Sequence, residues 1–229
     1  ATGGTATVGA ISTDINDVNI TAPTIKLGGN ITTEEDPNGG SADAASIDLN
    51  GDVVVNASTV TLTTGNGTID FSDNVNSAAS AGNNLTIVSG TGTAVFNDAI
   101  GTGTNGALGT LTVNSAGTGN ITFNSDADVG TTSVAGASRI LIGNAATGTL
   151  ALDGSFYTSS GGDSTNAAQI YTADAFTMSG TDPDFHSAAT AAAIKFVDGA
   201  GSDIVLSNSA DLTIQTNNGI IDIEPQIKG

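Results

Sequence analysis

The sequence predicts an all-β fold, a right-handed parallel β-helix (β-solenoid) of roughly nine coils with about 25 residues each. Three segments share one pattern, an alternating strand, a glycine-containing turn and a second strand ending in Phe: VTLTTGNGTIDF (60–71), LTIVSGTGTAVF (85–96) and LTVNSAGTGNITF (111–123). They start 25 and 26 residues apart, and LTIQTNNGIIDI (212–223) repeats the pattern. Because units that recur at this spacing are typical of solenoids, we expect residues 1–229 to form one domain, a segment of a longer repeat protein.

The composition agrees with a repeat core and excludes several functions. The chain has 31 Gly, no Trp and only 4% aromatic residues, so Val, Ile, Leu and Ala must build the core. The net charge of −19 comes from 23 acidic and 4 basic residues, too few cations for binding nucleic acid or adsorbing to an anionic membrane. No apolar run approaches membrane-spanning length, so we expect no membrane insertion. The absence of Cys excludes disulfides and thiolate metal sites.

The first part of the chain predicts short strands separated by close corners. Alternating runs such as VNIT (18–21) and TIKL (24–27) are separated by Pro23. Strands this short fit the faces of a coil better than they fit hairpins. The acidic segment 34–46 is expected to protrude from a corner as a surface loop.

The central repeats predict which side chains face the core. A strand alternates its side chains between two faces, so Val60 and Leu62 are expected to point inward, with Thr61 and Thr63 outward. Three phenylalanines are then expected to stack about 4.8 Å apart: Phe71, Phe96 and Phe123. Glycine pairs are expected at a shared corner with positive φ: Gly65/Gly67, Gly90/Gly92 and Gly117/Gly119.

The remainder of the chain keeps this pattern with more variation. We expect strands at 140–142, 149–152, 168–173, 176–178, 193–196 and 203–206. Longer loops are expected at 159–167 and 179–190, and the alanine-rich residues 188–193 could form one helical turn. No amphipathic capping helix is evident at either end, which leaves stacking on further repeats or on another copy open.

The stretch LTIVSGTGTAVFNDAIG…LGTLTVNSAGTGNITFNSDADVG (85–130) resembles the passenger repeats of filamentous-haemagglutinin-like exoproteins. These large bacterial proteins are often exported by two-partner secretion. The best matches are Phe96-Asn97-Asp98 and Phe123-Asn124-Ser125. The resemblance implies a right-handed β-helix, a secreted or cell-surface location and an adhesive or scaffolding role. It carries no catalytic residues, and the family's amino-terminal secretion signals are absent from this sequence.

We therefore expect a structural or adhesive segment that presents loops from a rigid rod to a host surface, a neighbouring cell or a matrix polysaccharide. One alternative is a filament or matrix subunit that stacks end to end. Another is a β-helix that binds or degrades polysaccharide. Degradation is not favoured. A glycosidase needs opposed carboxylates in a groove, and carboxylates are plentiful here, but the walls of a sugar cleft usually also need aromatic residues, of which this chain has only Phe and two Tyr. The basic residues that a lyase would use are scattered: Lys26, Arg139, Lys195 and Lys228.

Calcium is the ligand candidate, and no cofactor or catalytic residue is predicted. The segment Asp48-x-Asn50-Gly51-Asp52 resembles the start of an oxygen-rich calcium loop, without the distal Glu of an EF-hand. The candidate ligands are Asp48, Asn50, Asp52, Asp126, Asp128, Asp182 and Asp184. Each cluster can also be read as a solvated acidic turn. A further acidic cluster is formed by Glu34, Glu35 and Asp36.

Three other features have a structural and a functional interpretation. His186, the single histidine, lies in DPDFH and is expected to be a loop residue rather than a metal ligand or catalytic base. Formal glycosylation triplets are expected to be turn residues leading into strands: Asn19, Asn30, Asn56, Asn66, Asn84 and Asn120. Outward threonines could suggest ice binding, but the predicted face is irregular.

Overall fold

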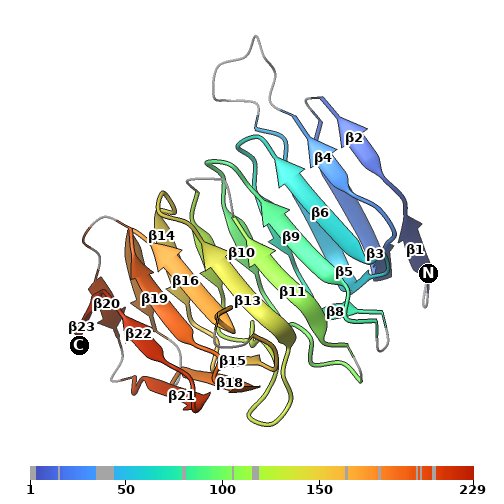
Figure 1. The fold of residues 1–229 in the computed structure, drawn as a ribbon. Coiled ribbons are helices and arrows are strands. Elements are labelled where there is room, and N and C mark those ends of the chain that lie inside the picture. Colours follow the sequence, from blue (N-terminus) through green and yellow to red (C-terminus); the bar gives the residue numbers. More distant parts are fainter. Residues whose placement is uncertain are drawn as a thin grey trace.

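The computed structural model describes residues 4–14, 16–34, 44–78, 81–104, 106–114, 119–162, 165–179, 182–199, 201, 203–207 and 210–229. Its strands pair in parallel and stack as a β-solenoid with about 27 residues per turn (Figure 1). The predicted fold class is confirmed, but the solenoid has about seven turns rather than the roughly nine predicted, and each turn is slightly longer than the 25 residues expected. The right-handed sense of the coil remains a prediction.

Two extended sheets contain the described strands. The first consists of β1 (Thr5–Val8), β3 (Val18–Leu27), β5 (Ile47–Val55), β7 (Ile69–Phe71), β8 (Val75–Ser77), β10 (Ala94–Phe96), β12 (Ile121–Phe123), β14 (Thr149–Leu152), β17 (Ala175–Met178), β20 (Asp203–Leu206) and β23 (Gln226–Lys228). The second consists of β2 (Ile11–Thr13), β4 (Ile31–Thr33), β6 (Thr59–Thr64), β9 (Asn84–Val88), β11 (Leu108–Val113), β13 (Ala137–Gly143), β15 (Phe156–Ser159), β16 (Gln169–Ala173), β18 (Asp184–Thr190), β19 (Ile194–Asp198), β21 (Thr213–Asn217) and β22 (Ile221–Ile223).

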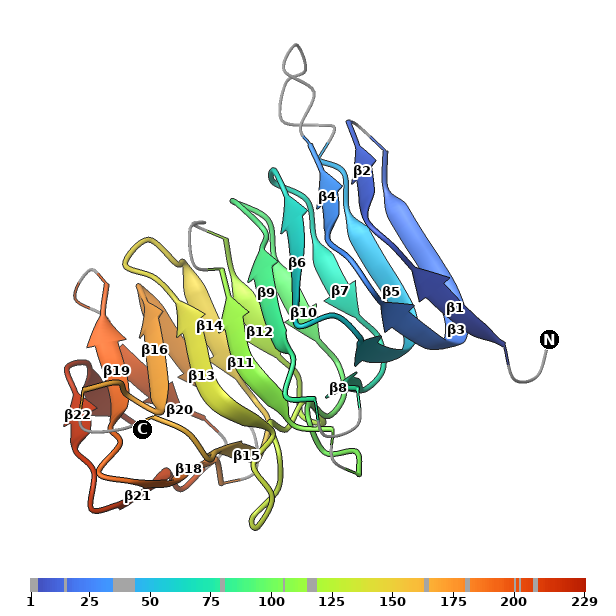
Figure 2. The same cartoon turned by 45° about the vertical axis from the view of Figure 1, so that its right-hand side comes forward.

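Each turn presents three faces in chain order. Face A contains the first half of β3 and of β5, then β7, β10, β12, β14, β17, β20 and β23. Face B contains β1, the second half of β3 and of β5, and then β8, β15, β18 and β21, with Ile100 and Val129 as isolated bridges. Face C contains β2, β4, β6, β9, β11, β13, β16, β19 and β22, which lie side by side in Figure 2.

The core is a continuous column inside these faces. About seven turns, from Val18 to Phe196, place a buried apolar residue on every face. In the turns at the two ends, apolar residues such as Ile11, Ile214 and Ile223 are only partly buried. The predicted alternation is confirmed, because Val60 and Leu62 are fully buried while Thr61 and Thr63 between them are partly exposed.

The predicted phenylalanine stack is also confirmed. Phe71, Phe96 and Phe123 are in register, and their successive ring centroids lie 4.9 and 4.8 Å apart. The column continues towards the C-terminus as a mixed cluster of stacked and edge-to-face rings. Its members are Tyr157, Tyr171, Phe176, Phe185 and Phe196.

The glycine corner has a different cause from the one predicted. Of the described members of these pairs, only Gly90 has a positive φ, 57°. Gly92 and Gly119 are required because the preceding coil leaves no space for a side chain. An added Cβ on Gly92 would lie 2.1 Å from the Gly67 oxygen, and one on Gly119 would lie 1.5 Å from the Gly92 oxygen. Gly117 lies outside the described residues.

All six strands predicted between residues 140 and 206 are present. The prediction of a loop over 179–190 was wrong from residue 184 onward, because β18 runs to Thr190 and pairs with β15 and β21. The helical turn at 188–193 is absent, and Ala191 instead turns the chain with a φ of 61°. Backbone hydrogen bonds to neighbouring coils override the helical propensity of this segment, since the Ala191 amide donates to the Asn217 oxygen (2.8 Å) and the Ala193 oxygen accepts from the Ala168 amide (2.9 Å). The strand β15 was not predicted.

Candidate functional surfaces

The calcium candidates Asp48, Asn50 and Asp52 lie on β5, where they alternate with buried residues and face outward. The Ser72 hydroxyl donates to Asn50 Oδ1 (2.9 Å), and the Asn74 amide donates to Asp52 Oδ1 (3.0 Å). An extended strand spreads these oxygens along a line, whereas an EF-hand loop wraps its ligands around one point. The segment is therefore not a loop of the EF-hand type.

Asp48 and Asp70 are in register on neighbouring coils of face A. Burial raises the pKa of both carboxyl groups, and Asp70 further raises that of Asp48. A hydrogen bond from the Asn97 amide to Asp70 Oδ1 (2.7 Å) opposes the rise at Asp70. The pair is thus a place where protonation or a bound cation would relieve electrostatic repulsion.

Asp126 and Asp128 occupy the turn after β12 and have different environments. Asp126 is exposed, whereas Asp128 Oδ1 accepts hydrogen bonds from the amides of Ser155 (2.6 Å) and Phe156 (3.0 Å) one coil away. Burial raises the pKa of Asp128, although these two hydrogen bonds oppose the rise. Asp128 therefore has a structural role in joining two coils.

Asp182 lies just before β18, and Asp184 is the first residue of this strand. His186 also lies on β18. Asp182 has a φ of 48°, and its Oδ1 accepts from the Asp211 amide (3.0 Å). Asp184 Oδ1 is buried and has no hydrogen-bond partner among the described residues. His186 is a strand residue, contrary to the predicted loop, and pairs in register with Thr158 and Gln215.

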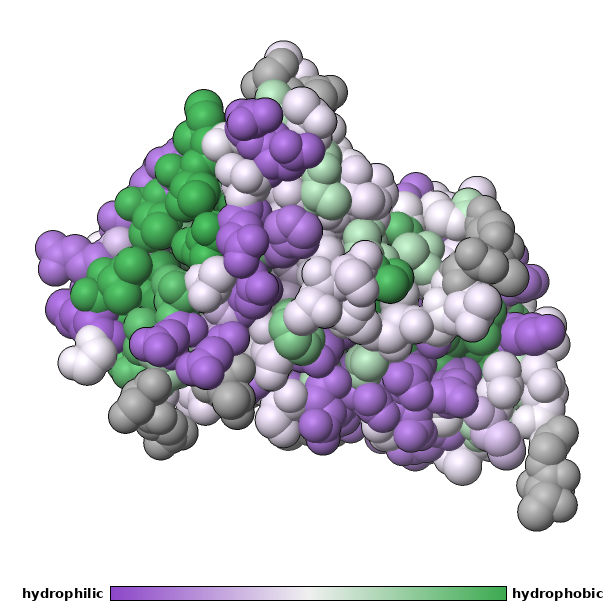
Figure 3. All heavy atoms as spheres, turned by 90° about the horizontal axis from the view of Figure 1, so that it is seen from below, coloured by the Kyte–Doolittle hydropathy of each residue, from purple (hydrophilic) through white to green (hydrophobic). Residues whose placement is uncertain are grey.

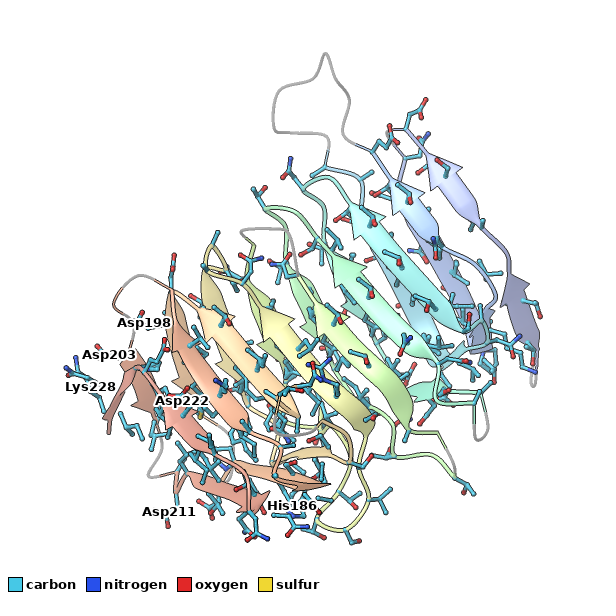
Figure 4. All side chains as sticks on the ribbon, viewed as in Figure 1. His186, Asp198, Asp203, Asp211, Asp222 and Lys228 are labelled. Atoms are coloured by element: carbon cyan, nitrogen blue, oxygen red, sulfur yellow. The ribbon has the colours of Figure 1, made fainter. Side chains whose placement is uncertain are left out.

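The acidic residues near the C-terminus line a small pocket of about 330 Å³. Asp203 forms an ion pair with Lys228, and Glu224 accepts a hydrogen bond from the Asp198 amide (3.1 Å). Figure 4 shows Asp198, Asp203 and Lys228 together at this end of the molecule. Within the described ranges, no three His, Cys, Asp or Glu side chains are arranged to hold a metal ion. Calcium binding at the seven candidate residues remains a prediction.

A larger groove of about 750 Å³ lies on the outer surface where faces A and B meet. Residues 22–23 form a bulge in β3 opposite Gly51, whose φ is 143°. An added Cβ on Gly51 would lie 1.7 Å from the Ala22 oxygen, so only glycine fits there. Asn50 and Asp52 line the groove beside this bulge. The groove was not predicted from the sequence, although the adjacent Ala22-Pro23 and Gly51 are signals for a bulge.

A buried polar network around Gln169 was also not predicted from the sequence. Gln169 is fully buried, and its Nε2 donates to the carbonyl oxygens of Tyr157 (2.7 Å) and His186 (2.8 Å). The Tyr171 hydroxyl donates to Gln169 Oε1 (3.0 Å). The alternation in QIYTA (169–173) is a sequence signal for this network, because the alternation places Gln169, Tyr171 and Ala173 on one side of β16.

Several asparagines of the glycosylation triplets bind the next coil. The side-chain oxygens of Asn30, Asn84 and Asn120 accept hydrogen bonds from threonine amides at 2.8–2.9 Å. Asn66 Oδ1 likewise accepts from the Thr91 amide (3.1 Å). Asn30, Asn66 and Asn120 lie in turns, as predicted, whereas Asn84 is the first residue of β9 and Asn19 lies within β3.

The outward threonine ladder on face C is short. Thr61, Thr86 and Thr112 are in register, but the next positions are Leu141 and Ile170. The face is irregular, as expected, and this geometry does not favour ice binding.

Comparison with known proteins finds no match to a family model, a curated protein or a solved structure. The described residues contain no helix long and apolar enough to span a membrane. These comparisons assign no family, and the β-solenoid fold alone is established.

Proposed function

We propose that this chain is a rigid structural or adhesive segment of a secreted or surface-attached bacterial protein, of the filamentous-haemagglutinin-like kind. The observation that carries the proposal is the uninterrupted buried column from Val18 to Phe196. Strands that pair in register through these turns on faces A and C leave little freedom to bend, so the segment acts as a spacer. Function then resides in the corner loops, which vary without disturbing the ladder.

The segment 34–46 is the first candidate for a presented loop. Glu34 and Ala45 anchor its two ends, since the Glu34 amide donates to the Thr13 oxygen (2.9 Å) and the Ala45 oxygen accepts from the Thr33 hydroxyl (2.8 Å). Residues 35–43 lie outside the described residues. The other candidate loops are 159–167 and 179–183. Residues 163–164 and 180–181 within them lie outside the described residues.

The test is adhesion of beads coated with the chain to bacterial cells, host cells and matrix polysaccharide. Replacing residues 35–43 by a Gly-Ser segment of equal length should reduce adhesion without changing the circular dichroism spectrum. The same replacement at 163–164 tests the second candidate loop in the same way. Equal adhesion of beads coated with the unmodified chain and with an unrelated acidic protein would contradict the proposal.

The groove beside Gly51 favours polysaccharide binding as a second candidate function. Its polar residues Asn50 and Asp52 can hydrogen-bond sugar hydroxyl groups, and the net charge of −19 favours a neutral glycan over a polyuronate. Calorimetry with neutral and acidic oligosaccharides tests this role. We expect binding of the neutral oligosaccharide only, with loss of binding in Asn50→Ala. Absence of heat with both sugars would contradict it.

A further inference from the structure

We infer that the folded chain resists endopeptidases that cleave after basic or aromatic residues, and that endopeptidases accepting small side chains cut its corner loops instead. This inference goes beyond the spacer and adhesive roles and does not depend on them. It rests on the position of the recognised residues, which lie within strands, and on the composition of the connections between those strands.

The four basic residues of the chain all lie in strands: Lys26 in β3, Arg139 in β13, Lys195 in β19 and Lys228 in β23. Lys26 has a paired strand on each side, β1 and β5, and Lys195 lies in the same way between β16 and β22. The strand of Arg139 pairs with β11 on one side and with β15 and β16 on the other. Arg139 Nε also donates to the Ala167 oxygen (3.0 Å), and Lys195 forms an ion pair with Asp222 (3.3 Å).

These strand positions hinder an endopeptidase of the trypsin type. Such an enzyme holds an extended backbone segment by main-chain hydrogen bonds and inserts one basic side chain into a pocket. The side chains of Lys26, Arg139 and Lys195 are at least partly exposed, but their strands are bonded to neighbouring coils along both edges. The enzyme can bind there only after a coil has opened on both sides. Local opening of this kind costs free energy, so the cleavable state is rarely populated.

The aromatic residues are protected in a second way, by burial of the side chain itself. All nine lie in strands, and eight of them are fully buried. Phe156 is partly exposed, but its amide donates to Asp128 Oδ1 (3.0 Å) and its oxygen accepts from the Val129 amide (2.7 Å). Met178 is buried in β17, and Leu212, directly before β21, is the one leucine outside a strand. The large apolar side chains that a chymotrypsin-type pocket takes are therefore held by the core or the ladder.

The connections between strands have a different composition. They consist mainly of Gly, Ala, Ser, Thr, Asn and Asp. Figure 3 shows mainly hydrophilic and intermediate side chains across the middle of the face seen from below. Ala145 and Ala146 are exposed between β13 and β14, and Val134 is 49% exposed between β12 and β13. Exposed loop tips with small residues are preferred points of proteolysis, and a pocket of the elastase type accepts such side chains.

Digestion of the folded chain with trypsin, chymotrypsin and elastase tests the inference. We expect trypsin and chymotrypsin to cleave it at least about 100-fold more slowly than the same chain unfolded in urea, because both enzymes must wait for a coil to open. A short peptide substrate corrects for the activity of each enzyme in urea. Elastase should cut the folded chain within its connections, as mass spectrometry of the fragments would show. Rapid tryptic cleavage after Lys26 or Arg139, or equal resistance to elastase, would overturn the inference.

A matched pair of lysine substitutions separates the position of the recognised residue from the stability of the fold. Thr165→Lys places a basic residue in the exposed connection between β15 and β16, whereas Thr86→Lys places one on β9, between Thr61 and Thr112 of the neighbouring coils. We expect trypsin to cut at the new lysine at least about tenfold faster in Thr165→Lys than in Thr86→Lys. Urea midpoints show that both variants are folded. Equal rates at the two new lysines, or cleavage at neither, would overturn the inference.

A second pair makes the same comparison for chymotrypsin. Val134→Phe adds a ring to the exposed connection before β13, and Val88→Phe adds one to a partly exposed strand position on β9, in register with Thr63. We expect cleavage after the new phenylalanine in Val134→Phe only. Cleavage after the new residue in folded Val88→Phe would show that the ladder does not exclude the enzyme, and would overturn the inference.

Discussion

The ring of Phe96 lies 4.9 Å from the ring of Phe71 on the preceding coil, and the two planes differ by only 4°. Both side chains are fully buried, and each belongs to a strand only three residues long. Strands this short contribute little stability on their own. Contacts between coils must therefore provide much of the stability in this part of the solenoid.

Phe96→Ala is expected to destabilise the chain by about 3–5 kcal/mol, because it opens a cavity between Phe71 and Phe123. Phe96→Leu should cost less, since it retains more of the buried volume. Urea unfolding followed by circular dichroism measures both. Equal midpoints for the two variants would show that the ring stack does not limit stability.

Gly119→Ala should destabilise the fold by about 1–3 kcal/mol or more, because the new methyl group would overlap the Gly92 oxygen. The control is Gly9→Ala, whose added Cβ meets no atom within 4 Å and whose φ lies outside the left-handed region. We expect its free energy of unfolding to change by less than about 0.5 kcal/mol. A tolerated Gly119→Ala would mean that the coils can separate locally at this corner.

Asp128→Ala should cost about 1–3 kcal/mol, because the amides of Ser155 and Phe156 lose their acceptor. Asp126→Ala, two residues away and exposed, should change stability by less than about 0.5 kcal/mol. Thermal unfolding of both variants with EDTA and with millimolar Ca²⁺ separates a structural role from a metal-binding role. A calcium-dependent rise in melting temperature that either variant abolishes would favour the metal role.

Gln169→Leu should destabilise the core by about 1–3 kcal/mol, since it leaves the Tyr171 hydroxyl buried without its acceptor. Gln169→Leu/Tyr171→Phe should recover part of this loss, because it removes the unpaired hydroxyl as well. Chemical denaturation of the single and double variants measures the difference. A double variant less stable than Gln169→Leu would contradict the proposed pairing.

Acidification from pH 7 is expected to increase stability. The folded state raises the pKa values of Asp48, Asp70 and Asp128 above the usual 3.8, mainly through burial. The folded chain therefore binds these protons more tightly than the unfolded chain. This stabilisation appears as the pH falls through the folded pKa values, and it is complete below 3.8, where both states are protonated.

Urea midpoints at several pH values between 7 and 4 measure this effect. Asp48→Asn should be more stable than the unmodified chain at pH 7 and should show a flatter pH dependence, because it cannot repel Asp70. Parallel pH curves for the two proteins would contradict the assignment of the effect to this pair.

The local sequence determined the repeat, the inward side of each central strand and the phenylalanine stack. These features depend on a period of two along a strand and on one recurring unit, both visible in residues 60–123. The strands at Ile140 and Ile194 followed from the same alternation.

Only the tertiary structure decided the features that depend on neighbouring coils. Ala188 and Ala189 have helical propensity but lie in β18, at the irregularity between Ser187 and Thr190, because both of these flanking residues pair with β21. Gly119 is required by the position of the Gly92 oxygen, 27 residues earlier in the chain, rather than by its own φ. The outward carboxylates of β5 were predicted as candidate ligands, but their spread along a line follows from the extended strand. Such features arise from contacts about one turn apart in sequence, which no local pattern records.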